Sequence, residues 1–186
     1  MKRITIIALA VTLLTACSKE NTEINPGSSV TTPNSEKVLQ ARAFSATINA
    51  AANPASQPTS CSGVVPFAAP DFNLSGSGIH LGQIGQTSSL HHVSCDVDIN
   101  TALLTTVVEG QIAAANGDLI YYDGNDVVDV AGLLTQTGTT GAIIGTWTIT
   151  GGTGRFEGAT GTLTINGLVD FVTFSFTCEC VGTITY

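Results

Sequence analysis

Apolar and polar residues alternate with a period of two along most of the chain beyond residue 40. Trp147 and Ile149 share one face with threonines between them, and Leu163 and Ile165 repeat this pattern farther along. No long stretch has helical periodicity, and Thr, Val, Ile and Gly dominate, as short strands and turns require. The alternation predicts an all-β fold with candidate strands at residues 41–49, 73–85, 88–99, 103–115, 118–122, 126–135, 142–150, 156–165 and 168–186.

Three short turn signals separate these candidate strands. Asn116-Gly117 and Asn166-Gly167 predict two-residue hairpin turns, because type I′ geometry requires positive φ at both central positions. Asp123-Gly124-Asn125 predicts a third turn. Sequential hairpins favour a closed antiparallel barrel of about eight strands, which has no free edges, over an open sandwich. Such a barrel has room for side chains or for one small ligand.

A glycine-rich stretch at residues 148–161 joins two of the predicted strands. A dinucleotide-binding loop needs its third glycine three residues after the second, followed by a helix. Here the spacing from Gly154 to Gly158 is too long, and a threonine-rich strand follows. A P-loop is excluded because the chain has no Gly-Lys-Ser/Thr. We therefore interpret these glycines as turn or bulge positions with positive φ.

The same hairpin carries a family resemblance. The residues that carry it are Ile149-Thr150-Gly151-Gly152, Gly154, Phe156-Glu157-Gly158 and Gly161, which resemble the hairpin of plant allene oxide cyclases and, more loosely, of dirigent proteins. The resemblance implies an allene oxide cyclase-like barrel with a hydrophobic ligand inside, and a homotrimer packed through barrel exteriors. Allene oxide cyclases use a glutamate and asparagines near their early strands. The corresponding residues 41–51 offer only Asn49, so we transfer no catalytic residue.

The first residues resemble a bacterial lipoprotein signal. Lys2 and Arg3 precede an apolar run at residues 4–14, which is too short to span a bilayer, and Leu14-Thr15-Ala16-Cys17 has the form of a lipobox. The resemblance implies cleavage before Cys17 and acylation of that cysteine, with an ordinary secretory signal as the alternative. Ser18 is typical of sorting to the outer membrane in Gram-negative bacteria. We expect a periplasmic or cell-surface lipoprotein. Lys19 and Glu20 faintly resemble the surface-export signals of Bacteroidota lipoproteins.

Composition divides the chain into three parts. Residues 1–16 are the predicted signal peptide, residues 17–40 a lipid anchor with a flexible polar tether, and residues 41–186 one folded β-barrel domain. Removal of the signal deletes two basic residues and changes the formal net charge from −8 to −10. This charge argues against nucleic acid as a partner. Only the lipid anchor is expected to contact the membrane.

Four cysteines remain after the predicted cleavage, and two disulfides are the default in an oxidising compartment. Cys178 and Cys180 point to the same face of one strand with Cα atoms ~6.5 to 7 Å apart, so we expect them not to pair with each other. Two connectivities remain, each joining Cys61 and Cys95 separately to the last strand. The proline-rich loop at residues 54–70 is either a binding lid or a crossover held by a disulfide.

Two parts of the sequence contain residues that could bind a metal. His91, His92 and Cys95 lie close together, but adjacent histidines point to opposite faces of a strand and thiols oxidise outside the cytosol. Asp96, Asp98 and Asn100 imitate the start of an EF-hand loop, but its required glycine and glutamate are replaced by Thr101 and Val107. We expect neither a metal nor a cofactor.

Two residues are candidates for lining the barrel lumen. His80, in Gly78-Ile79-His80-Leu81-Gly82, has an alternation that could turn it inward, and Glu109 could face the lumen or the solvent. No nucleophile elbow occurs. We therefore interpret the chain as a non-catalytic, lipid-anchored barrel that binds a small apolar ligand or acts as an interaction module. The alternative is an isomerase or cyclase that acts on a hydrophobic substrate.

Overall fold

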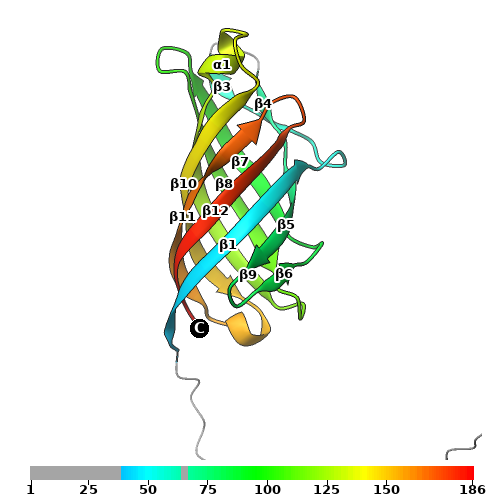
Figure 1. Cartoon of the computed structure of the whole chain (residues 1–186), viewed down its shortest axis with the longest axis vertical. Helices are drawn as coiled ribbons and strands as arrows, with labels where there is room; N and C mark the ends of the chain where they lie inside the picture. Colours follow the sequence, from blue (N-terminus) through cyan, green and yellow to red (C-terminus); the bar gives the residue numbers. More distant parts are fainter. Residues whose placement is uncertain (1–38, 64–66) are drawn as a thin grey trace, which may run out of the picture. The chain divides into compact units, whose positions relative to one another are not determined.

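The computed structural model describes residues 39–63 and 67–186, and within them eight strands pair edge to edge in a closed ring (Figure 1). The predicted all-β class and the ring of about eight strands are confirmed. In order around the ring the strands are β1 (Ala41–Ala52), β5 (Phe72–Gly78), β7 (Ser89–Asp98), β8 (Leu103–Ala113), β9 (Leu119–Asp129), β10 (Thr140–Gly152), β11 (Thr160–Asp170) and β12 (Ser175–Thr185). The remaining elements are short: β2 (Thr59–Ser60), β3 (Ser62–Gly63), β4 (Ala68–Ala69), β6 (Gly82–Ile84), α1 (Ala131–Leu134) and the 3₁₀ turn η1 (Gly154–Phe156).

All neighbouring strands of the ring are antiparallel, and the pairing between β5 and β7 is the shortest. It consists of Phe72 opposite Leu90 and Asn73 opposite Ser89, whereas β1 pairs with the whole of β12 from Ala41 to Ala51. Beyond this short pairing, β6 folds back on β5. The backbone on either side of β6 then hydrogen-bonds to residues 113 and 115 at the end of β8.

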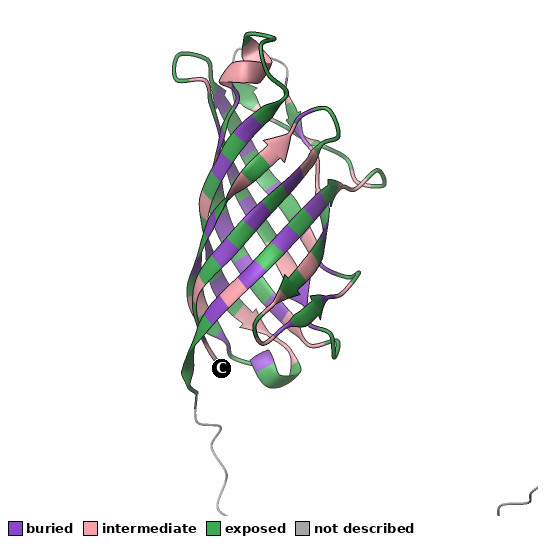
Figure 2. Ribbon diagram, in the orientation of Figure 1, coloured by how far each residue is buried: buried purple, intermediate pink, exposed green. Residues whose placement is uncertain are grey.

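Buried and exposed residues alternate along the ring strands (Figure 2), and most side chains inside the ring are apolar. On β12, for example, Phe176, Cys178 and Cys180 are buried, whereas Thr177 and Glu179 between them are exposed. The side-chain period of a strand is two, so one sequence pattern fixes both the strand and its inward face. The exposed threonines suit strands whose outer face meets solvent.

The ring has two ends. We name the end where β1 begins and β12 finishes the terminal end (Figure 1). The opposite end is the loop end, with α1, the β11–β12 turn and the crossing segment between β1 and β5, of which the structure describes residues 53–63 and 67–71. A large core cluster that includes Trp147, Tyr122 and Phe156 fills the ring toward the terminal end. A smaller cluster that includes Leu104 and Phe171 lies at the loop end.

The glycine-rich hairpin connects β10 to β11 through η1, as predicted. Gly154 has φ +57° and Gly158 has φ +72°, and the pairing of β10 with β9 shifts between Ile149 and Gly151. These are the turn and bulge positions with positive φ that the sequence indicates. A turn at Asn116-Gly117 between β8 and β9 is also confirmed, with Gly117 at φ +89°. Its predicted two-residue type I′ geometry is wrong, because Asn116 has no positive φ and β8 ends at Ala113 while β9 begins at Leu119.

The other two predicted turns are wrong. Asp123-Gly124-Asn125 lies in the middle of β9, and Asn166-Gly167 lies in the middle of β11. Close packing explains Gly124: a Cβ atom there would collide with the indole ring of Trp147, which stacks on Tyr122 with ring centroids 4.3 Å apart. A glycine inside a strand can mark such a close approach as well as a turn.

The predicted disulfide connectivities are also wrong, because Cys61 pairs with Cys95. The crossing segment runs along β7, where β3 pairs in parallel with Asp96 and Val97, and this places Cys61 beside Cys95. Cys178 and Cys180 do not pair with each other, as expected, and face the core as free thiols with Sγ atoms 3.7 Å apart. The loop is thus held by a disulfide, but to β7 rather than to the last strand.

Other predictions fall on residues that the structure does not describe. The signal peptide at residues 1–16, lipidation at Cys17 and the tether up to residue 38 lie outside the described ranges. Strand β1 begins at Ala41, the first residue of the predicted domain. Within residues 39–63 and 67–186, none of the helices has the length and apolar character needed to cross a bilayer.

Candidate ligand pocket

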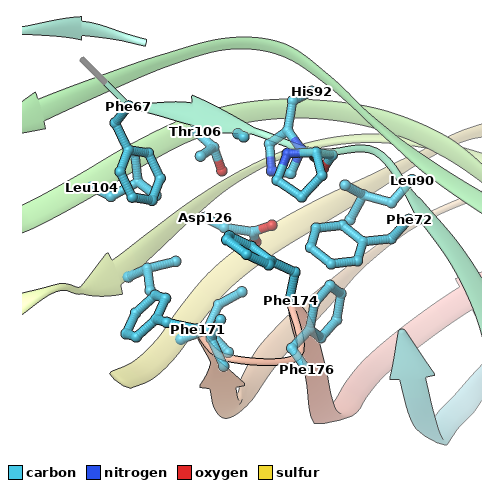
Figure 3. Close-up of a pocket in the computed structure, with 15 residues that line it drawn as sticks. Phe67, Phe72, Leu90, His92, Leu104, Thr106, Asp126, Phe171, Phe174 and Phe176 are labelled. Carbon is cyan, nitrogen blue, oxygen red and sulfur yellow. Dashed lines mark hydrogen bonds between the residues drawn. The ribbon is translucent and has the colours of Figure 1, made fainter. Parts of the chain in front are cut away.

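A cavity of about 50 Å³ lies inside the ring near the loop end, between the two core clusters (Figure 3). Its walls are mainly apolar and include the side chains of Phe67, Phe72, Phe171, Phe174 and Phe176. These rings come from the crossing segment, from β5, from the β11–β12 turn and from β12. Apolar walls with a few polar groups are typical of small-molecule sites.

Three polar side chains line the same cavity, one from each of three neighbouring strands. His92 is on β7, Thr106 on β8 and Asp126 on β9, and all three are buried (Figure 3). Thr106 and Asp126 are directly opposite each other in the β8–β9 register, which places their Cβ atoms about 4.5–5.5 Å apart. They form a polar patch in an otherwise apolar interior.

Asp126 occupies an inward position of β9 and is only 2% exposed. Its Oδ1 accepts a hydrogen bond from Trp147 Nε1 at 3.0 Å, and Gly145 on β10 leaves room for the carboxyl, because a Cβ atom there would collide with Oδ1. Oδ2 has no protein partner within the described ranges. Burial raises the pKa of Asp126 to about 7, against the lowering effect of the Trp147 hydrogen bond. The group is therefore close to half-protonated at neutral pH.

Thr106 carries a fully buried polar atom that lacks a hydrogen-bond partner in the described part of the chain. Its Oγ1 is buried and has no hydrogen-bond partner among the residues that the structure describes. A buried hydroxyl without a partner costs about 1–3 kcal/mol of stability, so such groups are rare in native interiors. A polar group inside the cavity would satisfy it.

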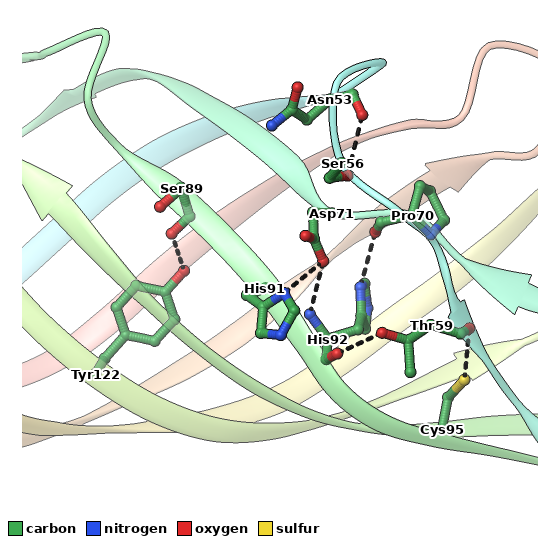
Figure 4. Close-up of polar contacts among 10 residues, drawn as sticks. All are labelled: Asn53, Ser56, Thr59, Pro70, Asp71, Ser89, His91, His92, Cys95 and Tyr122. Atoms are coloured by element: carbon green, nitrogen blue, oxygen red, sulfur yellow. Dashed lines mark hydrogen bonds and ion pairs between the residues drawn. The ribbon is translucent and has the colours of Figure 1, made fainter.

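His92 is fixed by contacts to the crossing segment (Figure 4). Its Nδ1 lies 2.8 Å from the carbonyl oxygen of Pro70, so this nitrogen carries the proton and Nε2 is the acceptor of the neutral ring. Its backbone N–H donates to Asp71 Oδ1, which also accepts from His91 Nδ1 at 2.9 Å. Burial lowers the pKa of His92, although the Pro70 carbonyl and Asp71 act in the opposite direction. His92 is therefore neutral at pH 7.

A β-bulge in β7 determines which residues of this strand face inward. The register with β8 shifts between His92 and Ser94, and Val93 at this shift is exposed. Residues on either side of a bulge change phase, so both His92 and Cys95 point into the ring. As expected, the adjacent His91 points outward.

The two predicted lumen residues do not line the cavity. Glu109 is exposed, because even-numbered residues of β8 such as Thr106 and Val108 face inward. His80 lies beyond the end of β5, in the turn to β6 at the terminal end, with φ +69° and its ring against Tyr186. Neither residue belongs to the pocket.

No sequence motif identifies the pocket's polar residues. Asp126 stands in the inward phase of Ile120, Tyr122, Gly124 and Val128, and a charged residue in an apolar phase is a signal. That signal is lost when Asp123-Gly124-Asn125 is interpreted as a turn. The metal hypothesis directed attention to His92, but its neighbour Cys95 is in the disulfide. Among the described residues, no three His, Cys, Asp or Glu side chains are grouped so that they could hold a metal ion.

Comparison with family models, with curated proteins and with solved structures finds no match for this chain. The function therefore has to be argued from the pocket.

Proposed function

We propose that the protein binds a small, largely apolar molecule in this pocket, through one polar group that meets Thr106 and Asp126. The observation that carries the proposal is the unpartnered Thr106 hydroxyl in a cavity lined by phenylalanines. Water alone could satisfy a hydroxyl, but water does not account for five aromatic rings around the same space. The cavity has room for a few non-hydrogen atoms as it stands.

Phe174 is the residue that separates the cavity from the outside. Its side chain lines the cavity and also an outer groove formed by Ala52 at the end of β1 and by Asn53 and Pro54 of the crossing segment. It is 46% exposed, and its φ of +48° is unusual for a residue that is not glycine. Movement of this side chain would join the cavity to the groove and admit a longer molecule.

Ligand binding is tested by native mass spectrometry and lipid extraction of protein purified under mild conditions. We expect a co-purified molecule with the wild type, and a reduced amount with Thr106→Val, which keeps the shape of the side chain but removes the hydroxyl. Thr164→Val is the matched control, because Thr164 is an exposed threonine on the outer face of β11. Equal occupancy in the two variants would remove Thr106 from the site.

An isomerase or cyclase is the second candidate, and one observation favours it. Asp126, with a pKa of about 7, and the neutral His92 line the same cavity, so a proton donor and a proton acceptor face one substrate. The test is to incubate an extracted ligand with fresh protein and to search for an isomer of the same mass by chromatography. Asp126→Asn should abolish such conversion but leave the fold intact.

The protein's location and assembly are part of the proposal. The lipobox at Leu14-Thr15-Ala16-Cys17 supports a lipoprotein anchored to the outer membrane, and the hairpin resemblance supports a barrel of the allene oxide cyclase type. Val107, Ile144 and Val181 are exposed on the outer face and would suit a homotrimer. Labelling with a palmitate analogue in cells, lost in Cys17→Ala, tests the anchor, and sedimentation velocity tests the trimer.

A further inference from the structure

Hydrogen-bond acceptors outnumber donors in the pocket. Asp126 Oδ2 and His92 Nε2 present lone pairs, since Trp147 and Pro70 take up the other polar atoms of these side chains. Thr106 Oγ1 also has free lone pairs. No N–H group of a side chain points into this space from the lining residues, because His92 uses its only N–H on Pro70. The ligand group that complements three acceptors is one with several N–H donors.

The charge around the pocket selects the sign of the ligand. The described residues contain eleven acidic side chains but only two basic ones, Arg42 and Arg155. Both arginines are at the terminal end, in β1 and η1, and neither lines the cavity. Asp126 therefore has no cationic partner in the part of the chain that the structure describes. The overall field attracts cations, and a carboxylate ligand would face repulsion from Asp126.

The aromatic lining suits a cation with an apolar body. The faces of phenylalanine rings attract ammonium groups, and the attraction strengthens when water is excluded. Phe72 and Phe176 are in edge-to-face contact at 5.0 Å, so their rings are held in place. The same rings provide an apolar surface for a hydrocarbon chain.

We propose that the pocket binds a primary alkylammonium ion. Its three N–H donors meet Asp126, Thr106 and His92, and its hydrocarbon chain lies among the phenylalanines. This inference rests on the proposed function, because it concerns the same pocket, and it specifies the class of ligand. The cavity of about 50 Å³ takes the ammonium group and the first carbons, and a longer chain passes Phe174 into the outer groove.

Binding must depend on pH, and the groups that face Asp126 set the direction. Tyr122 stays neutral because burial raises the pKa of its hydroxyl well above the usual value, and the hydrogen bond with Cys178 and burial raise the pKa of the Cys180 thiol. Cys178 is a buried thiol beside it. Burial lowers the pKa of His92, so its ring becomes charged only at acidic pH, where the charged ring would repel a bound cation. Ionised Asp126 is the form that binds an ammonium ion, so affinity falls on acidification.

The experiment is isothermal titration calorimetry of the purified protein with n-butylammonium chloride at pH 5.5, 6.5 and 8. We expect the affinity to fall about tenfold for each pH unit below the pKa of Asp126. Near pH 7, titrations in two buffers of different ionisation enthalpy should reveal proton release, because the ligand displaces the proton of the carboxyl. An alkylammonium ion keeps its own charge throughout this range.

Three probes of similar size separate the possible results. 1-Butanol has the same chain without the charge, butyrate has the opposite charge, and tetramethylammonium has the charge without N–H donors. We expect all three to bind at least tenfold more weakly than n-butylammonium at pH 8. If 1-butanol binds as well as n-butylammonium, the ammonium proposal fails, but the proposed function stands. If tetramethylammonium binds as well, the N–H contacts are refuted.

Two variants with matched controls complete the test. Asp126→Asn should remove the pH dependence and weaken n-butylammonium binding at pH 8 by tenfold or more, whereas Asp123→Asn, an exposed position on the same strand, should change neither. Thr106→Val should weaken binding severalfold and keep the pH dependence, which gives a second result if Asp126→Asn unfolds. If no probe binds and no molecule co-purifies, both the ammonium inference and the proposed function are refuted.

Discussion

Burial of Asp126 predicts an unusual pH dependence of stability. The folded-state pKa of this carboxyl is raised from 3.8 to about 7, so between these values the unfolded chain is ionised and the folded chain keeps its proton. The folded state then binds more protons than the unfolded state, and stability falls as pH rises from about 4 to about 7. Above pH 7 the contribution is constant. The full displacement of the pKa corresponds to about 4 kcal/mol.

Asp126→Asn isolates this contribution. An asparagine keeps a carbonyl oxygen for Trp147 Nε1 but cannot ionise, so the cost of burying a charge disappears. We expect similar stabilities of the two proteins at pH 4, and an advantage for Asp126→Asn that grows to between about 1 and 4 kcal/mol at pH 8. Asp123→Asn is the control on the same strand, with an exposed side chain and no expected change of this kind.

The assay is urea unfolding followed by tryptophan fluorescence at pH 4, 5.5, 7 and 8. The chain has one tryptophan, Trp147, which is fully buried beside Asp126 and so reports on this region. Other groups also titrate on acidification: His92 becomes charged, and only below the ordinary pKa of 3.8 does the exposed Asp98 become neutral, because hydrogen bonds from Asn100 and Thr101 lower its pKa. These contributions cancel when the variant is subtracted from the wild type. If the difference in stability between Asp126→Asn and the wild type does not change with pH, Asp126 is not buried in its protonated form.

Three further predictions concern the surroundings of the pocket. Phe174→Gly should accelerate the association of n-butylammonium in stopped-flow mixing and leave the free energy of unfolding within about 1 kcal/mol of the wild type, because glycine tolerates φ +48°. An unchanged association rate would show that Phe174 does not limit entry. Replacement of both Cys61 and Cys95 by serine should lower stability by about 4 kcal/mol in urea, as expected for a disulfide that spans 34 residues, and a loss below 1 kcal/mol would contradict this. Gly145→Ala should cost about 1–3 kcal/mol and abolish binding, because the methyl group displaces Asp126; retained binding in calorimetry would show that the carboxyl need not occupy its present position.

The alternation of apolar and polar residues predicts most of this fold, because each ring strand has one face exposed to solvent and one face buried inside the ring. Where alternation is uniform, as at residues 142–150 and 156–165, the predicted strands overlap β10 and β11. It fails where a glycine inside a strand resembles a turn. Gly124 makes room for the ring of Trp147 on the neighbouring strand, and only the register between β9 and β10 reveals that contact.

Neither the disulfide nor the pocket follows from local pattern. Cys61 meets Cys95 because the crossing segment folds over β7, a tertiary contact between residues 34 positions apart. The sequence also does not show which residues of β8 face inward, since Val107 and Val108 are both apolar and either could face the core. An error of one residue in that phase exchanges the inward-facing Thr106 for the outward-facing Glu109.

The polar patch lowers the stability of the empty protein. A protonated Asp126 and an unpartnered Thr106 each cost free energy in the interior, and an apolar residue of similar size at either position would avoid that cost. Buried polar residues in an otherwise apolar core are expected where a function requires them. A ligand that hydrogen-bonds to both groups would remove the two costs together. The same two residues that weaken the empty ring are therefore the ones through which a bound molecule would stabilise it.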